Sequence, residues 1–308
     1  MDELEKIFNE KNISESSKKL YMNNLHRLNG GKPIKNLKFL NNCEDTLSKI
    51  QNYKPNTQRS YIISVVSLLK ELAGQRKYKK LYDRYYEVLE KMNTDLKDQT
   101  QKTDKEKQEW IGNDKVMEKL EECMAVIRQI EGQKKITNEK YRELLACVIT
   151  GLFVIQTPRR NKDYMEMVVT KKYSPEMSED KNYLDLKTNR FILNQYKTKG
   201  TYNQQTADVE PLMREIIDVY LKYHPLKKEL KGSATIPFLV DEDGTPLQSN
   251  NAITRILYKV FDKKIGSSML RKLYLTDKYK DIMDEMKEDA TKMGTSVNTI
   301  KNNYIKED

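Results

Sequence analysis

Two arginines in the second part of the chain have the side chain and the local setting to hold a phosphate group. Arg160 follows a long apolar segment, and Asp163 lies three residues further on, where it could brace a guanidinium or cap the next turn. A guanidinium is planar and permanently charged, so it can hold a phosphate through two parallel hydrogen bonds. Arg271 lies just after Gly266, at an expected helix start, where its charge opposes the helix dipole. That placement favours an anion nearby.

Each arginine also has a simpler explanation. Arg160 and Asp163 could form a surface ion pair at the start of a helix. Arg271 could belong to an ordinary basic first turn. These alternatives stay open when each position is considered alone.

A lysine-rich segment follows an expected strand. Lys197 and Lys199 flank Thr198, between Tyr196 and Gly200. An ammonium at the tip of a β-hairpin could reach into DNA and give a proton to a leaving oxygen. Lysine-rich hairpin tips also occur for solubility alone. The residues do not decide which of the two lysines would act as the acid.

The C-terminal segment contains a possible nucleophile. The run Met293-Gly-Thr-Ser is followed, nine residues after Thr295, by Tyr304. A phenol has a pKa of about 10, so its attack on a phosphate at neutral pH needs positive charge close by. The chain has 19 tyrosines, so a lone C-terminal tyrosine would usually serve packing. Tyr304 becomes a candidate only through its place after the arginines and the lysine.

The order of these motifs resembles that of the tyrosine recombinase, or phage integrase, family of DNA-breaking and rejoining enzymes. Arg160 with Asp163 resembles the family's first arginine and the acidic residue three positions later. Lys197, which precedes a threonine, resembles its hairpin lysine, and Lys199 is the alternative. The resemblance covers a catalytic domain at 109–308.

The remaining motifs resemble the family with two departures. Ser268-Met-Leu-Arg271 is similar to the family's His-x-Leu-Arg, and Met293-Gly-Thr-Ser is similar to its Leu-Gly-His-Ser turn, with Tyr304 at the nucleophile's spacing. Ser268 and Thr295 therefore stand where the family commonly has histidines. A missing imidazole removes an obvious general base, whereas a hydroxyl can still donate a hydrogen bond to a phosphate oxygen.

The resemblance implies a reaction in which Tyr304 forms a covalent 3′-phosphotyrosyl link to DNA. It implies that Arg160 and Arg271 hold the phosphate and that Lys197 protonates the leaving 5′-oxygen. Such a reaction requires no cofactor, no metal ion and no ATP. The expected partners are double-stranded DNA and further copies of the chain, as a tetramer on paired DNA sites.

Composition agrees with a polyanionic partner and excludes other site classes. The formal net charge is +10 and the pI about 9.1, and a basic surplus of this kind favours nucleic acid. The thiols Cys43, Cys123 and Cys147 have neither disulfide-frame nor zinc-site spacing. With only His26 and His224, a histidine-based metal site or Ser-His-Asp triad has little material. We therefore expect an intracellular, DNA-associated protein, in a prokaryotic cytoplasm or in a nucleus or viral factory.

Hydrophobic periodicity predicts a mainly α fold with a small antiparallel sheet. Residues 1–93 read as helices, one with N-cap residues offered by Ser14-Glu-Ser-Ser and another that follows Pro55-Asn-Thr, and the resemblance implies that they form a core-binding domain that clamps DNA. Apolar residues nearly vanish over 94–108, which predicts a charged linker. Short β-like runs near 183–186, 191–196 and 206–209 interrupt the helices of 109–308. The most apolar stretch, 144–155, is too short for a bilayer, which takes about 20 residues.

Three other functions fit parts of this pattern. A relaxing enzyme of the type IB topoisomerase kind has the same catalytic residues and acts as a monomer. A non-catalytic DNA-binding or packaging protein descended from the family would keep the basic surface without the chemistry. A helical protein–protein scaffold would leave the paired arginines unexplained.

Overall fold

The computed structural model describes residues 3–97, 102–232 and 234–306, and the chain divides into two compact units, Met1–Lys102 and Thr103–Asp308. The charged segment 94–108, expected to be a linker, is helical at both ends. Helix α5 (Arg76–Lys97) continues into it, and α6 (Asp104–Glu109) begins within it. Helix α6 has a complete capping box, because Thr103 and Glu106 satisfy each other's backbone N–H groups. Residues 98–101 of the expected linker lie outside the described residues.

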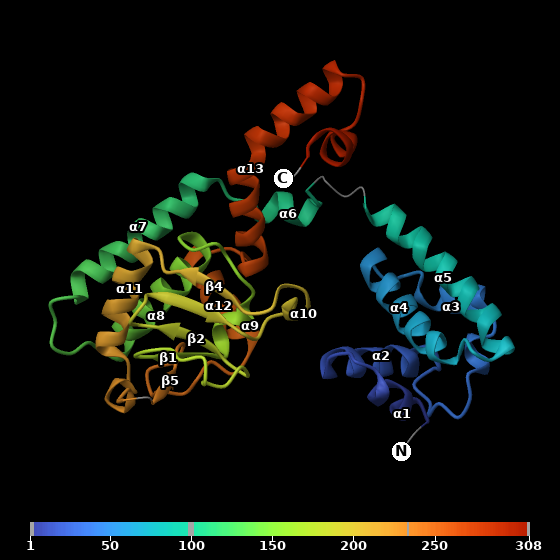
Figure 1. The fold of residues 1–308 in the computed structure, drawn as a ribbon, viewed down its shortest axis with the longest axis horizontal. Coiled ribbons are helices and arrows are strands. Elements are labelled where there is room, and N and C mark those ends of the chain that lie inside the picture. The colour runs from blue at the N-terminus through green and yellow to red at the C-terminus, as the bar shows by residue number, and fades with distance from the viewer. Residues whose placement is uncertain (1–2, 98–101, 233, 307–308) are drawn as a thin grey trace. The chain divides into compact units, whose positions relative to one another are not determined.

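The first unit is a helical domain around one hydrophobic core. Its remaining helices are α1 (Glu3–Glu10), α2 (Glu15–Leu28), α3 (Cys43–Ile50) and α4 (Pro55–Leu72) (Figure 1). Ser14 caps α2 by accepting a hydrogen bond from the Ser17 N–H, and Pro55 opens α4. The N-cap expected within Ser14-Glu-Ser-Ser is therefore confirmed, whereas the helix expected to follow Pro55-Asn-Thr already includes these three residues. Helix α4 packs against α2 and α5, and its apolar stripe forms much of the core.

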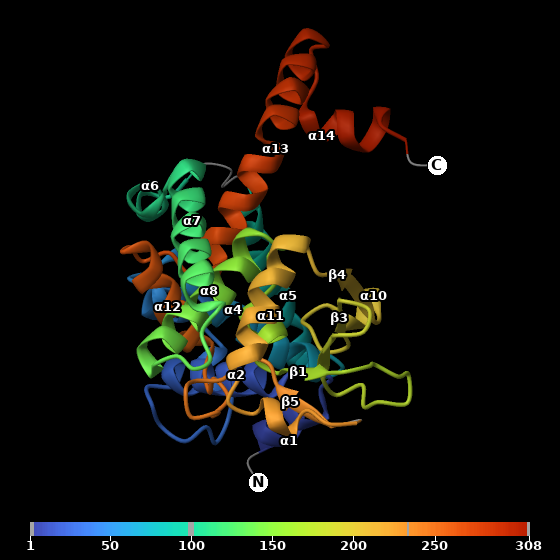
Figure 2. The same ribbon diagram turned by 90° about the vertical axis from the view of Figure 1, so that its left-hand side faces the viewer.

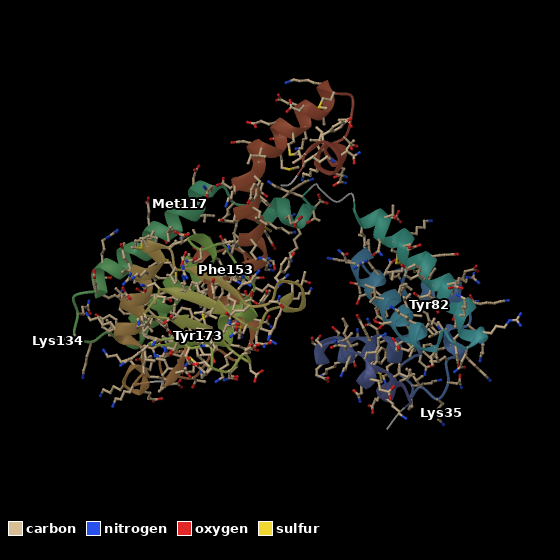
Figure 3. The ribbon with its side chains drawn as sticks, in the orientation of Figure 1. Lys35, Tyr82, Met117, Lys134, Phe153 and Tyr173 are labelled. Carbon is tan, nitrogen blue, oxygen red and sulfur yellow. The ribbon has the colours of Figure 1, made fainter. Side chains whose placement is uncertain are left out.

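The second unit is built around one buried helix, α8 (Asn138–Val154). It packs against α7 (Asn113–Ile130), α11 (Pro211–Tyr223), α12 (Asn250–Phe261) and α13 (Ser267–Lys292). Because neighbours cover it on several sides, α8 is apolar around most of its circumference. Figure 3 labels Phe153 within this core and Met117 on the outer side of α7, where Met117 is 45% exposed.

A small sheet lies beside α8 and has the strand order β4-β3-β2-β1-β5. The strands are β1 (Met167–Thr170), β2 (Asn182–Asp185), β3 (Arg190–Leu193), β4 (Gln205–Asp208) and β5 (Thr235–Pro237). The expectation of a small sheet is confirmed, but the expectation that it is antiparallel is wrong. Strands β1 and β2 pair in parallel, because the segment 171–181 returns the chain to the same end of the sheet, and the other three pairings are antiparallel.

The C-terminal part of the second unit is dominated by α13, a continuous helix of 26 residues. The sequence has neither glycine nor proline between Ser267 and Lys292, so nothing in it breaks the backbone hydrogen bonding. Figures 1 and 2 both show α13 extending beyond the rest of the unit. Beyond its outer end follow α14 (Val297–Thr299) and a π-helical turn, Ile300–Tyr304. The helix start expected after Gly266 is confirmed, since Gly266 is the N-cap of α13, and Gly294 follows the C-cap of the same helix.

Candidate functional site

The first arginine motif forms a turn between α8 and the short helix α9 (Asn161–Met165). Arg160 is the extended N-cap residue of α9. The carboxylate of Asp163 pairs with Arg159, not with Arg160 as the sequence had led us to expect, and the Arg159 Nε lies 3.1 Å from the Asp163 Oδ2. The Asp163 side chain is 3% exposed. A buried carboxylate needs a cation or hydrogen-bond donors, and Arg159 supplies one of them.

Arg159 has two further contacts that hold it in place. Its Nη1 donates to the Oε1 of Gln205 on β4 at 3.1 Å. Its guanidinium lies over the ring of Tyr196, 5.1 Å from the centroid. Arg160, in contrast, is half-buried and makes no side-chain hydrogen bond or ion pair with any residue that the structure describes. Arg159 is therefore the structural arginine of this turn, and Arg160 is the one available for an anion.

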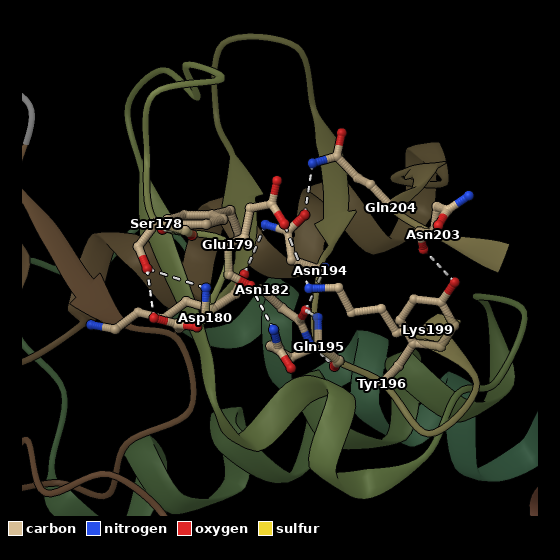
Figure 4. Close-up of polar contacts among 12 residues, drawn as sticks. Ser178, Glu179, Asp180, Asn182, Asn194, Gln195, Tyr196, Lys199, Asn203 and Gln204 are labelled. Carbon is tan, nitrogen blue, oxygen red and sulfur yellow. Dashed lines mark hydrogen bonds and ion pairs between the residues drawn. The ribbon is translucent and has the colours of Figure 1, made fainter. Parts of the chain in front are cut away.

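The lysine motif lies in the loop between β3 and β4, which was expected to be a simple hairpin tip. The loop instead contains a helical turn, α10 (Lys199–Tyr202), and the Tyr196 hydroxyl donates to the Asn203 carbonyl at 2.5 Å. The Lys199 ammonium lies 3.6 Å from the Glu179 carboxylate (Figure 4). Lys197 is exposed and forms no ion pair within the described part of the chain. The structure thus distinguishes two lysines that the sequence left equivalent.

The second arginine motif opens α13. Gly266 is the N-cap and offers no side chain to the first backbone N–H groups, and Ser268 is exposed in the first turn. Arg271 is half-buried, and its guanidinium has no hydrogen-bond or ion-pair partner among the described side chains and backbone groups. Arg271 therefore resembles Arg160 in being a half-buried cation without a protein partner.

The arginine turn lies close to the start of α13, as two observations indicate. The Thr157 hydroxyl, on the arginine turn, lies 3.4 Å from the hydroxyl of Tyr274 on α13. Burial raises the pKa of the Tyr164 phenol, and the positive charges of Arg159 and Arg271 both oppose this increase. Because such effects weaken with distance, both arginines must lie near the same buried ring.

The Gly-Thr turn is not part of this cluster. Gly294 has φ +65°, and the N–H groups of Gly294 and Thr295 donate to the carbonyls of Thr291 and Ala290 at 3.2 and 2.9 Å. This is the Schellman pattern that ends a helix. The Ser296 hydroxyl then caps α14 by accepting from the Thr299 N–H at 3.1 Å. Turn chemistry alone accounts for this motif in the present arrangement, with Thr295 half-buried.

Tyr304 also lies apart from the arginines. Its side chain is 61% exposed. The segment that carries it folds back onto the outer half of α13, where the Lys301 ammonium lies 3.8 Å from the Met283 sulfur. Met283 lies 12 positions after Arg271 on α13, so the two residues are about 18 Å apart along the helix axis. The structure brings together the segments of Arg160, Lys197 and Arg271, but it does not bring Tyr304 to them.

A polar pocket of about 360 Å³ adjoins the first turn of α13. Its lining includes Ser268, Lys264 and Lys272. Glu106 of α6 reaches it and accepts hydrogen bonds from the Lys272 ammonium and from Thr103, which lowers the pKa of the Glu106 carboxyl to about 2. The sequence reasoning missed Glu106, although the Thr103-x-x-Glu106 capping box was a signal for it.

The remaining observations concern other kinds of site. The three cysteines are buried thiols, and the Cys147 thiol donates a hydrogen bond to the Cys123 carbonyl at 3.5 Å. Within the described residues there is no group of three or more His, Cys, Asp or Glu side chains placed to hold a metal ion. In the same part of the chain, every helix lacks the length or the apolar character of a membrane span. Comparisons of the chain with protein-family models, with curated proteins and with solved structures give no match.

Proposed function

We propose that this protein cleaves and rejoins double-stranded DNA as a site-specific recombinase or integrase of the tyrosine recombinase kind. The observation that carries the proposal is a pair of half-buried arginines, Arg160 and Arg271, without protein partners and on segments that meet. The contact of Thr157 with Tyr274 joins these segments at 3.4 Å. A guanidinium without a protein partner has its N–H donors free for an anion, and a DNA phosphate matches the geometry of these donors.

In the proposed reaction the arginines bind the non-bridging oxygens of the scissile phosphate. Their charge stabilises the pentacovalent transition state, and fixed donors of this type contribute roughly 3–4 kcal/mol each in comparable oxyanion sites. The Tyr304 phenol loses its proton to solvent water, and its oxygen forms a bond to phosphorus as the bond to the 5′-oxygen breaks. Lys197 gives its proton to this leaving 5′-oxygen, because Lys199 is engaged by Glu179. The Ser268 hydroxyl donates a further hydrogen bond. The phosphotyrosyl product keeps the energy of the broken phosphodiester, so a 5′-hydroxyl can reseal it without ATP.

The nucleophile must come to this cluster, because Tyr304 of the same chain lies beside the outer half of α13. We propose that a second copy of the chain supplies Tyr304 and Thr295, in a tetramer on paired DNA sites. The apolar side chains of Leu275, Tyr279 and Ile282 support an association along α13. They are 49%, 43% and 52% exposed and lie on one face of the helix, and exposed apolar stripes of this kind mark interaction surfaces.

Mixing of two inactive variants tests the source of the nucleophile. Arg271→Ala keeps the nucleophile Tyr304 but lacks a phosphate-binding arginine. Tyr304→Phe keeps both arginines but lacks the nucleophile. If Tyr304 acts on a neighbouring copy's arginines, the mixture forms a covalent DNA adduct that neither variant forms alone. A mixture as inactive as its components contradicts donation by a second copy.

Trapping on a nicked suicide substrate tests the reaction itself. The unaltered protein is expected to give an SDS-stable protein–DNA adduct that maps to Tyr304. Tyr304→Phe should abolish the adduct and retain DNA binding, whereas the control Tyr86→Phe, at an exposed tyrosine of the first unit, should retain both. An adduct that persists in Tyr304→Phe contradicts the proposed role of this residue.

DNA affinity should come mainly from phosphate contacts. The net charge of +10 supports this expectation. Each phosphate that a lysine or arginine neutralises makes the logarithm of affinity fall by about 0.9 per tenfold rise in salt. An affinity that does not change with salt concentration would contradict a DNA partner.

A non-catalytic DNA-binding protein is the second candidate. The position of Tyr304 outside the arginine cluster favours it, as do Ser268 and Thr295 at positions where the family commonly has histidines. It predicts salt-dependent DNA binding without an adduct, unchanged in Tyr304→Phe. A relaxing enzyme of the type IB topoisomerase kind differs in another way, since it would relax supercoils without exchanging strands between two DNA molecules.

A further inference from the structure

A single buried asparagine joins two parts of the proposed site. Asn182, the first residue of β2, is 1% exposed. Its Oδ1 accepts hydrogen bonds from the backbone N–H groups of Asn194 and Gln195 at 2.8 and 2.7 Å. Its Nδ2 donates to the backbone carbonyls of Asp163 and Gln195, both at 2.9 Å. All four hydrogen-bonding positions of the amide are thereby used. Figure 4 shows Asn182 beside Asn194 and Gln195.

The backbone groups that Asn182 binds belong to different elements. Asp163 lies in α9, directly after the arginine turn and three residues after Arg160. Asn194 and Gln195 begin the loop that carries Lys197. The amide of Asn182 therefore connects the turn of the phosphate-binding arginine directly with the loop of the proposed acid.

Further hydrogen bonds stiffen the loop at its two ends. The Asn194 Nδ2 donates to the Lys181 carbonyl at 3.0 Å, beside Asn182. The Gln204 Nε2 donates to the Asn194 Oδ1 at 2.6 Å, so the end of the loop is tied back to its beginning (Figure 4). Lys197 lies within this tied segment, two residues after the last backbone group that Asn182 binds. The backbone that carries Lys197 is thus held at one end by the Asn182 amide.

We propose that Asn182 is a positioning residue that sets the place of Lys197 relative to Arg160, an inference that rests on the proposed function. Its carboxamide suits this task because it accepts from two N–H groups and donates to two carbonyls. An aspartate has the same shape but would place a carboxylate against the carbonyls of Asp163 and Gln195. An alanine would leave four buried backbone groups without partners.

The test compares ordinary DNA with DNA whose scissile 5′-bridging oxygen is replaced by sulfur. A thiol has a much lower pKa than an alcohol. A thiolate therefore leaves without a proton from a general acid, whereas an alkoxide needs one. Lys197→Ala should lose adduct formation by about 100-fold or more on ordinary DNA and recover most of it on the sulfur substrate. If Asn182 acts through Lys197, Asn182→Ala and Asn182→Asp should show the same loss and the same recovery.

A buried asparagine in the first unit provides the matched control. The Asn24 Nδ2 donates to the Ser64 hydroxyl at 3.0 Å, and Asn24 is 4% exposed. Asn24→Ala should lower folding stability, but it should leave the ratio of rates on the two substrates at the value of the unaltered protein. Urea denaturation of every variant separates lost folding from lost positioning, and Asn182→Asp, which keeps the side-chain volume, serves if Asn182→Ala does not fold.

The outcomes separate this inference from the function on which it rests. The positioning role is overturned if folded Asn182 variants lose adduct formation equally on both substrates, or if they keep full activity on ordinary DNA. In either case Lys197→Ala still tests whether Lys197 is the general acid. If the unaltered protein gives no adduct with either substrate, the proposed function fails, and the inference fails with it.

Discussion

The hydroxyl oxygens of Thr157 and Tyr274 lie 3.4 Å apart, although 117 positions separate these residues in the sequence. Thr157 opens the arginine turn, and Tyr274 lies about one helical turn beyond Arg271 on α13. The contact shows which parts of the fold must be in place before Arg160 and Arg271 can share a ligand. Both segments rest on α8, whose end leads into the turn and whose side packs against α13.

The neighbouring arginines Arg159 and Arg160 should respond differently to substitution. Arg159→Ala leaves the buried carboxylate of Asp163 without its cation, so the free energy of unfolding should fall by about 3 kcal/mol. Arg160→Ala removes no hydrogen bond or ion pair to a described residue, so it should change the free energy of unfolding by less than about 0.5 kcal/mol, while it weakens DNA binding. Urea denaturation and binding titrations check both. Equal stability of the two variants would contradict the assignment of Asp163 to Arg159.

Stability of the second unit should depend on pH through His224. The ring is 2% exposed, its Nδ1 lies 3.1 Å from the Leu226 N–H nitrogen and its Nε2 lies 3.1 Å from the Pro237 carbonyl oxygen. Burial lowers the pKa of His224 to about 4. Below pH ~6.5 the unfolded chain binds a proton at His224, whereas the folded chain does not bind it until the pH approaches ~4. The free energy of unfolding should therefore fall between pH ~6.5 and ~4, by about 3 kcal/mol at most.

Urea denaturation across this pH range measures the effect of His224. His224→Gln should be less stable than the unaltered protein at pH 7, because the ring's hydrogen bonds are lost. It should also show a shallower decline toward pH 4. A decline of unchanged steepness in the variant would assign the pH dependence to other groups.

In the first unit, the Tyr85 hydroxyl should contribute to stability more than that of its neighbour. It donates to the Leu40 carbonyl at 2.9 Å and lies 2.7 Å from the Thr46 hydroxyl in the core. Tyr85→Phe leaves these buried groups short of a partner and should cost about 1–3 kcal/mol. Tyr86, 41% exposed, is the control, and Tyr86→Phe should have little effect. Thermal denaturation of the two variants measures both effects on stability.

Gly294 should tolerate asparagine better than alanine. Its φ of +65° lies in the left-handed region, and a Cβ there would meet nothing within 4 Å. The cost of Gly294→Ala is therefore confined to the backbone, about 1–2 kcal/mol. Asparagine adopts this conformation more easily, so Gly294→Asn should cost less. Faster amide hydrogen exchange in the last turn of α13 in Gly294→Ala, compared with Gly294→Asn, is the expected signature.

Signals close together in the sequence were sufficient for most of the helices. Ser14 caps one expected helix and Pro55 lies in the first turn of another, because capping and proline preferences act over a few residues. Gly266 and Gly294 bound α13 for the same reason. The short strand β1 was missed, since four consecutive buried residues have no alternation by which a strand could be recognised.

The contacts within the candidate site depended on the fold and could not be predicted. Arg159 and Arg160 are equivalent by sequence, and only the approach of Gln205 and Tyr196 selects Arg159 as the anchored one. Asn182 has no motif around it, because its partners are backbone groups 12 to 19 positions away. The distance from Arg271 to Tyr304 follows from the course of α13, which the spacing of the motifs does not specify.

The place of β1 in the sheet has a consequence for synthesis on the ribosome. One side of β1 pairs with β2 soon after translation, but the other side waits for β5, at Thr235–Pro237. Until those residues emerge, a nascent chain presents an open strand edge of apolar character, which can pair with another polypeptide. Chains released before position 235 should therefore aggregate, and slow translation of 171–234 should increase the need for chaperones.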